Sequence, residues 1–212
     1  MSRAKRLVDV AASACGLLVL APLLAAIAVA VRRDGGPAFF RQWRVGRGGQ
    51  PFRLWKFRTM VPNAEGLGPA LTAAGDPRVT RVGAWLRRRK LDELPQLLNV
   101  LAGDMRLVGP RPEVPRYVAR YTADQRRVLQ LVPGITDPAS LAYCAEEQLL
   151  AAADEPERLY VEAILPDKVR RNLAYAERAT VLTDLGVVLR TLGVLAGPSR
   201  PTAVVSPQVS RS

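Results

Sequence analysis

The sequence predicts a mostly α protein with a small β-hairpin, in which an N-terminal re-entrant membrane helix and amphipathic interfacial helices surround a compact cytosolic domain. Three observations support this fold class. Residues 10–31 carry no charge and contain a single proline, which is typical of a membrane segment with an internal break. Residues 38–60 hold two strand-like segments around a glycine-rich turn. Farther along the chain, apolar residues recur at helical spacing.

The composition limits the chemistry that this protein can perform. The 212 residues are 49% apolar, enough for one domain with accessory segments, and the net charge is 31 − 19 = +12. This charge favours an anionic partner, such as nucleic acid, acidic lipid or a phosphorylated substrate. The absence of histidine excludes Ser-His-Asp and Cys-His catalysis and histidine-ligated zinc. Cys144 has no histidine to activate it, so Asp, Glu, Lys and Tyr are the first candidates for acid–base or nucleophilic work.

Residues 1–34 are expected to form a membrane anchor. A helix over the 22 uncharged residues would be about 33 Å long, which is enough to cross a bilayer. Pro22 removes one backbone hydrogen bond near the middle, so we expect a helix–break–helix. Basic residues flank both ends, and the positive-inside rule then favours an anchor that enters and leaves by one face. A single-pass helix is the alternative, because short basic flanks can be carried across the membrane.

Residues 38–60 are predicted to form a β-hairpin with its turn at Gly46–Gly49. Basic side chains mixed with aromatic ones suit single-stranded nucleic acid or acidic lipid headgroups, and the neighbouring anchor favours the headgroups. Lys56 and Arg58 lie two residues apart on one strand face, so both can point at one anion. Solvated surface charge is the competing interpretation of this pair.

The compact domain is predicted over residues 35–197, and a disordered tail over residues 198–212. After a loop, a short amphipathic helix is expected to turn Val82, Trp85 and Leu86 towards the membrane interface and its arginines away from it. Further helices are expected over residues 91–101, 114–131, 137–155 and 168–195. We interpret the leucine stripe of the last helix as core or as an interface.

Residues 87–113 hold the candidate site. The basic run 87–90 leads into the adjacent carboxylates Asp92 and Glu93, and Arg111 follows between two prolines that restrict its backbone. The cations are expected to keep both carboxylates ionised at neutral pH. Carboxylates that ligate a hard cation, next to phosphate-binding arginines, are typical of phosphoryl transfer. Two solvated acids at the start of a helix are the alternative interpretation.

Four segments also match a known family: KFRTM at 56–60, DPRVTRVGAWLR at 76–87, LDELPQLLNVLAGDM at 91–105 and VGPRPE at 108–113. They resemble the bacterial sugar transferases, the monotopic polyprenyl-phosphate phosphoglycosyl transferases, and the resemblance extends over residues 4–195. It implies transfer of a sugar 1-phosphate from a nucleotide-diphosphate sugar, with a UDP-sugar expected, to polyprenyl (undecaprenyl) phosphate. This would be the first membrane step of glycoconjugate or polysaccharide biosynthesis. The family works on the cytoplasmic face of the bacterial inner membrane, by a ping-pong route with Mg²⁺.

Carried over by motif, the resemblance assigns roles to five residues. It implies that Asp92 is the nucleophile that takes the phosphosugar and that Glu93 is its partner near the metal, so both are candidate Mg²⁺ ligands. Lys56, Arg58 and Arg111 fall in matching motifs and are expected to contact phosphate. The expected partners are the nucleotide-diphosphate sugar, polyprenyl phosphate and acidic lipid headgroups of the membrane, without nucleic acid. A homo-oligomer is left open.

The chain departs from the family at two places. Many members have Ser-Pro where this chain has Ala21-Pro22, so a hydroxyl that could satisfy a freed backbone group is missing. The common segment GWAQVNGR is replaced by DPASLAYCAEEQLLA from Asp137, which leaves sugar and nucleotide contacts open. Glu146 and Glu147 are candidates there, with exposed helical acids as the alternative. The rivals to an enzyme are a catalytically inactive membrane-surface adaptor that uses its basic face, and a nucleic-acid binder.

Overall fold

The computed structural model describes residues 3–68 and 71–196, so the tail predicted over 198–212 lies outside the described part. Helices dominate this part of the chain, and two sheets of two strands each accompany them. The prediction of a mostly helical protein with a small hairpin is confirmed at this level. The second sheet was not predicted.

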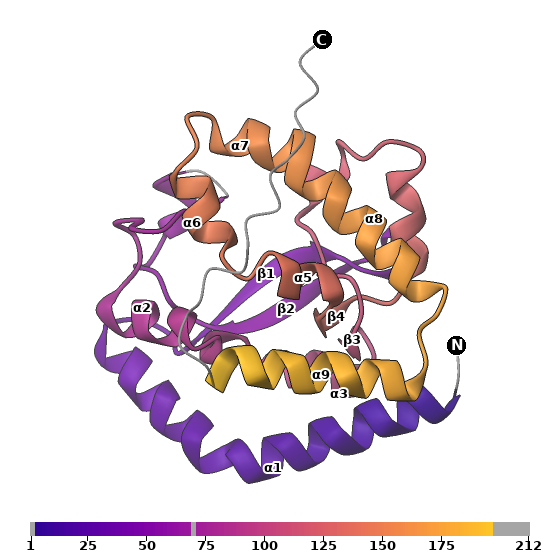
Figure 1. Ribbon diagram of the computed structural model, residues 1–212. Helices are drawn as coiled ribbons and strands as arrows, with labels where there is room; N and C mark the ends of the chain where they lie inside the picture. The colour runs from indigo at the N-terminus through magenta and orange to yellow at the C-terminus, as the bar shows by residue number, and fades with distance from the viewer. Residues whose placement is uncertain (1–2, 69–70, 197–212) are drawn as a thin grey trace.

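The N-terminal helix α1 spans Arg3–Arg33 and is apolar and long enough to cross a membrane. It is continuous through Pro22, so the expected break takes the form of a bend, visible near the middle of the indigo helix in Figure 1. Its buried residues lie towards its two ends: Asp9, Ser13, Ile27 and Val31. In the middle, Leu18 is 78% exposed. The helix therefore touches the rest of the protein at both ends and leaves its centre uncovered.

The predicted hairpin is present, with β1 at Phe39–Val45 and β2 at Pro51–Phe57 in antiparallel register. A single 3₁₀ turn joins the strands. In that turn, Gly48 and Gly49 have φ values of 68° and 78°, which a residue with a Cβ rarely adopts. The local sequence therefore determines where the hairpin reverses.

Helix α2, Arg81–Arg88, follows the hairpin closely. It begins at Thr80, whose Oγ1 accepts a hydrogen bond from the backbone N–H of Gly83 at 2.9 Å. A Cβ on Gly83 would lie 2.0 Å from the carbonyl oxygen of Thr59, so only glycine lets the helix lie directly on the chain that leaves β2. After the helix ends, Lys90 adopts a left-handed conformation with φ 53°.

Helix α3, Gln96–Ala102, is shorter than predicted because Leu91–Glu93 forms a 3₁₀ turn instead. The buried Asn99 joins this helix to the edge of β2. Its Oδ1 accepts a hydrogen bond from the N–H of Trp55 at 3.0 Å, and its Nδ2 donates to the carbonyl oxygen of Arg53 at 2.7 Å. These bonds satisfy the free edge of the hairpin and hold the site-bearing turn beside β2.

Among the described residues, the second half of the chain contains a parallel two-stranded sheet and six α-helices, with a 3₁₀ helix at Gln125–Gln130 and a π-helical segment at Tyr160–Ile164. Their bounds are β3 Arg106–Val108, α4 Pro115–Val118, β4 Gly134–Thr136, α5 Pro138–Ala142, α6 Glu146–Ala151, α7 Pro156–Leu159, α8 Leu165–Ala176 and α9 Val181–Ala196. The long helices predicted over 114–131, 137–155 and 168–195 are therefore wrong. Threonine caps interrupt two of them: Thr122 accepts from the N–H of Gln125, and Thr180 accepts from the N–H of Thr183.

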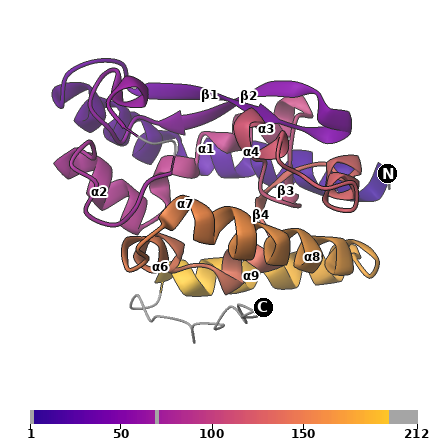
Figure 2. The ribbon, with the colours of Figure 1, turned by 90° about the horizontal axis from the view of Figure 1, so that it is seen from above.

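These elements form layers, with the hairpin on one side, α7, α8 and α9 on the other, and α3, β3 and β4 between them (Figure 2). The largest core cluster lies between the end of β1 and the helices α4, α6 and α8. In α9, by contrast, Leu182, Leu185, Leu189 and Leu192 are all exposed, so the predicted leucine stripe does not belong to this core. It runs along a helix whose first turn is tied to α1 by an ion pair between Asp184 Oδ2 and Lys5 Nζ at 2.7 Å.

Candidate active site

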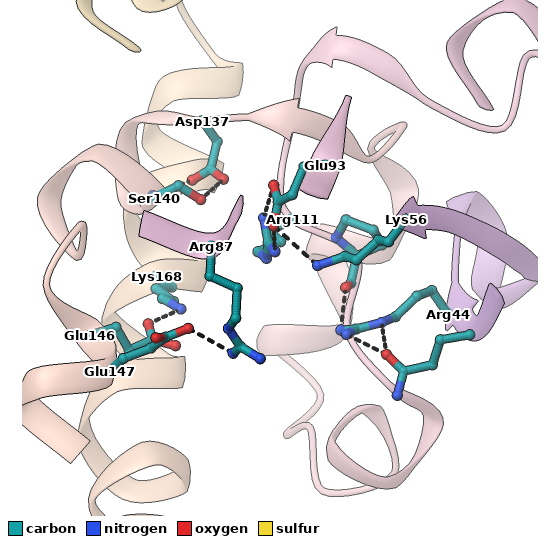
Figure 3. A network of polar contacts seen from close by, with 12 residues as sticks. Arg44, Lys56, Arg87, Glu93, Arg111, Asp137, Ser140, Glu146, Glu147 and Lys168 are labelled. Atoms are coloured by element: carbon teal, nitrogen blue, oxygen red, sulfur yellow. Dashed lines mark hydrogen bonds and ion pairs between the residues drawn. The ribbon is translucent and has the colours of Figure 1, made fainter. Parts of the chain in front are cut away.

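The carboxylate of Glu93 is the centre of the candidate site (Figure 3). Lys56, from β2, places its Nζ 3.1 Å from Glu93 Oε1. Arg111 donates from Nη1 to Glu93 Oε2 at 3.0 Å and from Nη2 to Oε1. Three of the five residues predicted for the site therefore meet, although they come from three separate segments of the chain.

The local sequence explains how Arg111 reaches this position. A Cβ on Gly109 would lie 2.4 Å from the carbonyl oxygen of Val132, so glycine is needed for this loop to pack against the chain that enters β4. Pro110 and Pro112 on either side of Arg111 limit its backbone freedom. The guanidinium of Arg44 donates to the carbonyl oxygen of Pro112 at 3.0 Å and ties the loop to β1. The arginine is thus held before any ligand arrives.

The charges around Glu93 decide its protonation state. Burial works against its charged form, but the neighbouring Arg111 and Lys56 outweigh burial and hold the pKa of Glu93 well below its usual range. Glu93 in turn raises the pKa of Arg111, while burial lowers the pKa of Lys56. The prediction that cations keep this carboxylate ionised agrees with these shifts.

Asp92 differs from its neighbour in being buried without a matching partner. Its side chain is 7% exposed, and its Oδ1 has no hydrogen-bond partner among residues 3–68 and 71–196. Burial raises the pKa of Asp92, and the charges of Lys56, Lys90 and Arg87 only partly oppose it. An unsatisfied buried oxygen is costly, so such an atom is a candidate for binding a metal or reacting with a substrate.

The carboxylates of the site offer few ligands for Mg²⁺. Within the described residues, no three Asp, Glu, Cys or His side chains gather as a metal cluster. The unpartnered Oδ1 of Asp92 fits a single hard-cation ligand. Both oxygens of Glu93 are occupied by Lys56 and Arg111, so Glu93 fits a supporting position better than a direct ligand. Mg²⁺ commonly binds through one or two carboxylates plus substrate phosphates, and this arrangement suits that pattern.

Arg58 does not join Lys56, contrary to the expectation from strand alternation. β2 ends at Phe57, and the buried guanidinium of Arg58 turns to backbone carbonyls instead. It donates to the oxygens of Pro37 at 2.9 Å, Met60 at 3.0 Å and Val31 at 2.8 Å. These contacts tie the end of α1 to the hairpin, so the structure gives Arg58 a supporting position away from Glu93.

Two ion pairs that the sequence did not predict border the site (Figure 3). Arg87 of α2 donates to Glu147 Oε1 at 2.8 Å, and Lys168 of α8 pairs with Glu146 Oε2. Glu146 also contributes to the raised pKa of Arg111. The segment from Asp137 that departs from the family therefore lies within electrostatic reach of the site. In the sequence, Glu146 and Glu147 are two adjacent acids in a chain rich in cations. This pattern does not predict that Glu147 pairs with Arg87, 60 residues away.

A cavity of about 40 Å³ lies beside Arg111. Its polar lining comes from Arg111, Glu113, Asp137, Ser140, Lys168 and Asn172. Asp137 is occupied locally, since its Oδ1 accepts from the backbone N–H groups of Ala139 and Ser140. The cavity therefore extends the polar environment of the site towards α8 and has room for little more than one or two waters.

Comparison with known proteins gives a consistent result. The model of the bacterial sugar transferase family matches residues 1–197. A UDP-glucose:undecaprenyl-phosphate glucose-1-phosphate transferase of Caulobacter vibrioides is 40% identical over 200 residues, which cover 89% of this chain and 68% of that protein.

Two other relatives are longer proteins that match in part. An undecaprenyl-phosphate galactose phosphotransferase of Salmonella typhimurium is 42% identical over 147 residues, covering 62% of this chain and 31% of that protein. An undecaprenyl-phosphate glucose phosphotransferase of Komagataeibacter xylinus is 43% identical over 153 residues, covering 65% of this chain and 27% of that protein. The chain thus spans about a third of the length of these two relatives.

Proposed function

The chain belongs to the bacterial sugar transferase family, and from this we propose that it transfers a sugar 1-phosphate from a nucleotide-diphosphate sugar to undecaprenyl phosphate. The names of its relatives in Caulobacter, Salmonella and Komagataeibacter support this reaction class. One observation carries the proposal: Glu93 is ionised and bound by Arg111 and Lys56, while the adjacent Asp92 is buried with an unpartnered Oδ1. A UDP-sugar is the expected donor.

In the first step, a carboxylate oxygen of Asp92 attacks the phosphorus that carries the sugar. The bond from this phosphorus to the bridging oxygen breaks, and the nucleoside monophosphate leaves with the electron pair. Lys56, Lys90 and Arg87 favour the ionised form of Asp92 that this attack requires. Lys56 and Arg111, both fixed on Glu93, are placed to neutralise the charge of the diphosphate.

In the second step, a phosphate oxygen of the polyprenyl acceptor attacks the same phosphorus. The bond from Asp92 to phosphorus breaks, and the carboxylate is regenerated as the polyprenyl-diphosphate sugar leaves. Asp92 would hold Mg²⁺ together with substrate phosphates, with Glu93 supporting the site, and the ion would supply charge neutralisation for both displacements. Two displacements at one phosphorus fit a ping-pong order.

We also propose that α1 is re-entrant, so that both of its ends and the folded domain lie on the cytoplasmic face of the bacterial inner membrane. Near the N-terminal end, Arg6 donates to the carbonyl oxygens of Val100 and Leu101 at 2.5 and 3.0 Å. Near the C-terminal end, Val31 accepts from Arg58. A straight span would put the two ends of α1 on opposite faces of a hydrocarbon core about 30 Å thick. A domain on one face could not then contact both ends of the helix. The exposed leucines of α9 and of the middle of α1 support contact with lipid.

Release of nucleoside monophosphate is the test of the reaction. Purified protein with Mg²⁺, a panel of UDP-sugars and undecaprenyl phosphate is expected to release UMP, and protein trapped with donor alone is expected to gain one phosphosugar mass on Asp92. Turnover without any modified intermediate would overturn the ping-pong route. Absence of turnover with every donor would favour the membrane-surface adaptor.

The topology of the anchor has a separate test. A cysteine at position 2, in a background without Cys15 and Cys144, is expected to be shielded from an impermeant thiol reagent in intact cells. Labelling from outside would mean that α1 crosses.

A further inference from the structure

An apolar groove of about 370 Å³ opens between the C-terminal half of α1 and α2. Its lining residues are Ile27, Ala30, Arg81, Val82, Trp85 and Leu86. Leu86 and Ile27 are buried and form its floor, while Trp85 is 39% exposed and forms part of its wall. The volume is within the range of small-ligand sites, which run from about 300 to 1,000 Å³. Arg81 is the one charged residue of the lining.

The groove is connected to the candidate active site by direct packing. Its floor belongs to a hydrophobic cluster that includes Val31 and Phe57, and Leu91 packs against this cluster. Leu91 is the residue next to Asp92 in the 3₁₀ turn. The groove and the turn that carries Asp92 therefore share one hydrophobic cluster.

Cations follow the groove residues along the chain towards Asp92. On α2, the apolar residues Val82 and Trp85 are followed within one turn by Arg87, which already lies at the border of the site through its ion pair with Glu147. Lys90 follows three residues later, and its charge acts on Asp92. An apolar groove followed in the chain by cations that act on the site complements a molecule with a long apolar tail and a phosphate head.

We propose that this groove holds the first isoprene units of the acceptor, with the phosphate of polyprenyl phosphate directed towards Asp92. The assignment rests on the proposed function and deepens it. The polar nucleotide-diphosphate sugar does not match apolar walls, whereas the hydrocarbon chain of polyprenyl phosphate does. The position also fits the source of the acceptor, because α1 is the membrane segment and Val29, beside the groove residue Ala30, is 52% exposed.

Filling the groove tests this assignment. Ala30→Trp puts a large side chain into the groove, and Ala26→Trp puts the same side chain at an exposed position one turn earlier on α1. We expect Ala30→Trp to raise KM for undecaprenyl phosphate by about ten-fold or more, since lost fit to a hydrophobic chain has effects of this size. KM for the donor and the donor-only release of UMP should stay near the wild-type values. Ala26→Trp should change neither KM.

The outcomes separate the groove from the reaction. If the wild type turns over and Ala30→Trp leaves KM for undecaprenyl phosphate within about two-fold of the wild type, the groove is not the acceptor site, and the proposed function stands. If Ala30→Trp slows the donor-only step as much as the complete reaction, the groove has another role. If the wild type releases no UMP with any donor, the proposed function fails on its own evidence.

A binding measurement gives a readout that does not depend on turnover. A polyprenyl phosphate with a diazirine near its phosphate end should label peptides from Ile27–Ala30 and Val82–Leu86 in the full-length protein in nanodiscs. Undecaprenyl phosphate should compete for this labelling, and an equal amount of phosphatidylglycerol should not. Equal competition by phosphatidylglycerol would show a groove for bulk lipid, and labelling only at other segments would also overturn the proposal.

Discussion

Arg111 and Glu93 form a two-point ion pair: Arg111 Nη1 lies 3.0 Å from Glu93 Oε2, and Nη2 donates to Oε1. Lys56 approaches the same carboxylate from β2. One acid therefore fixes the positions of two cations, which would otherwise repel each other. This use of Glu93 leaves its neighbour Asp92 as the carboxylate that is available for chemistry.

Replacing Asp92, the proposed nucleophile, should stop the reaction without unfolding the protein. Asp92→Asn is expected to lower kcat by about 10⁴-fold or more, because both displacements pass through this oxygen. It should also abolish the phosphosugar adduct in mass spectrometry. Its Tm should be equal to or above that of the wild type, since a buried and unpartnered charge is removed. A variant that keeps substantial turnover would place the nucleophile elsewhere.

Breaking the Arg111–Glu93 pair should cost stability as well as activity. Arg111→Met is expected to lower the free energy of unfolding by about 2 kcal/mol, less than for a fully buried pair because this side chain is 31% exposed. Adding Glu93→Gln to Arg111→Met should cost less than the sum of the two single changes, because the charge left without its partner is then removed. Thermal or denaturant unfolding in detergent measures both effects. Additive losses would mean that the two residues act independently.

The pKa of Glu93 predicts a pH dependence of stability. The folded protein holds the pKa of Glu93 well below the ordinary value of 4.5. The contacts of Glu93 with Arg111 and Lys56 therefore contribute stability above pH 4.5, and this contribution is lost as the pH falls towards the folded pKa. The difference in unfolding free energy between the wild type and Glu93→Gln should therefore be constant near neutral pH and shrink below about 4.5. Because the charge of Glu93 also raises the pKa of Asp92, the same comparison is made in an Asp92→Asn background, where this second group is removed. A constant difference down to pH 3 would contradict the assigned shift.

Metal removal should act through Asp92. EDTA is expected to stop UMP release, and Mg²⁺ should restore it. With a nucleoside diphosphate present, Mg²⁺ at about 100 times its Kd should stabilise the wild type by about 2.7 kcal/mol, and Asp92→Asn should gain much less. Glu93→Gln, in contrast, should keep part of the stabilisation if it is a supporting residue. Equal stabilisation of the wild type and Asp92→Asn would exclude Asp92 as a ligand.

Arg58 should behave as a structural residue. Arg58→Lys retains the charge but cannot make all three bonds to Pro37, Met60 and Val31, so we expect a loss of about 2 kcal/mol in stability. Below its Tm, KM for the donor should stay close to that of the wild type. A large rise in KM for the donor at unchanged stability would restore Arg58 to the phosphate-binding set.

Local sequence features predicted those parts of the fold that local forces build. The hairpin follows from a turn where glycines adopt positive φ, and α1 follows from its uncharged run. Two of the helix predictions after residue 113 failed because threonine caps at Thr122 and Thr180 interrupt patterns that periodicity alone joins. The motifs identified Asp92, Glu93, Lys56 and Arg111 before the structure placed the last three together.

The sequence by itself determined the chemical types available here: acids and cations without histidine, next to a long apolar helix. Only the tertiary structure decided which partners these side chains have. Arg58 is taken up by carbonyls of α1 and the following loop, whereas Lys56, two residues away, reaches Glu93. The reason is physical: a charged side chain takes the partner that its buried surroundings bring within about 3 Å, and those surroundings come from distant segments of the chain.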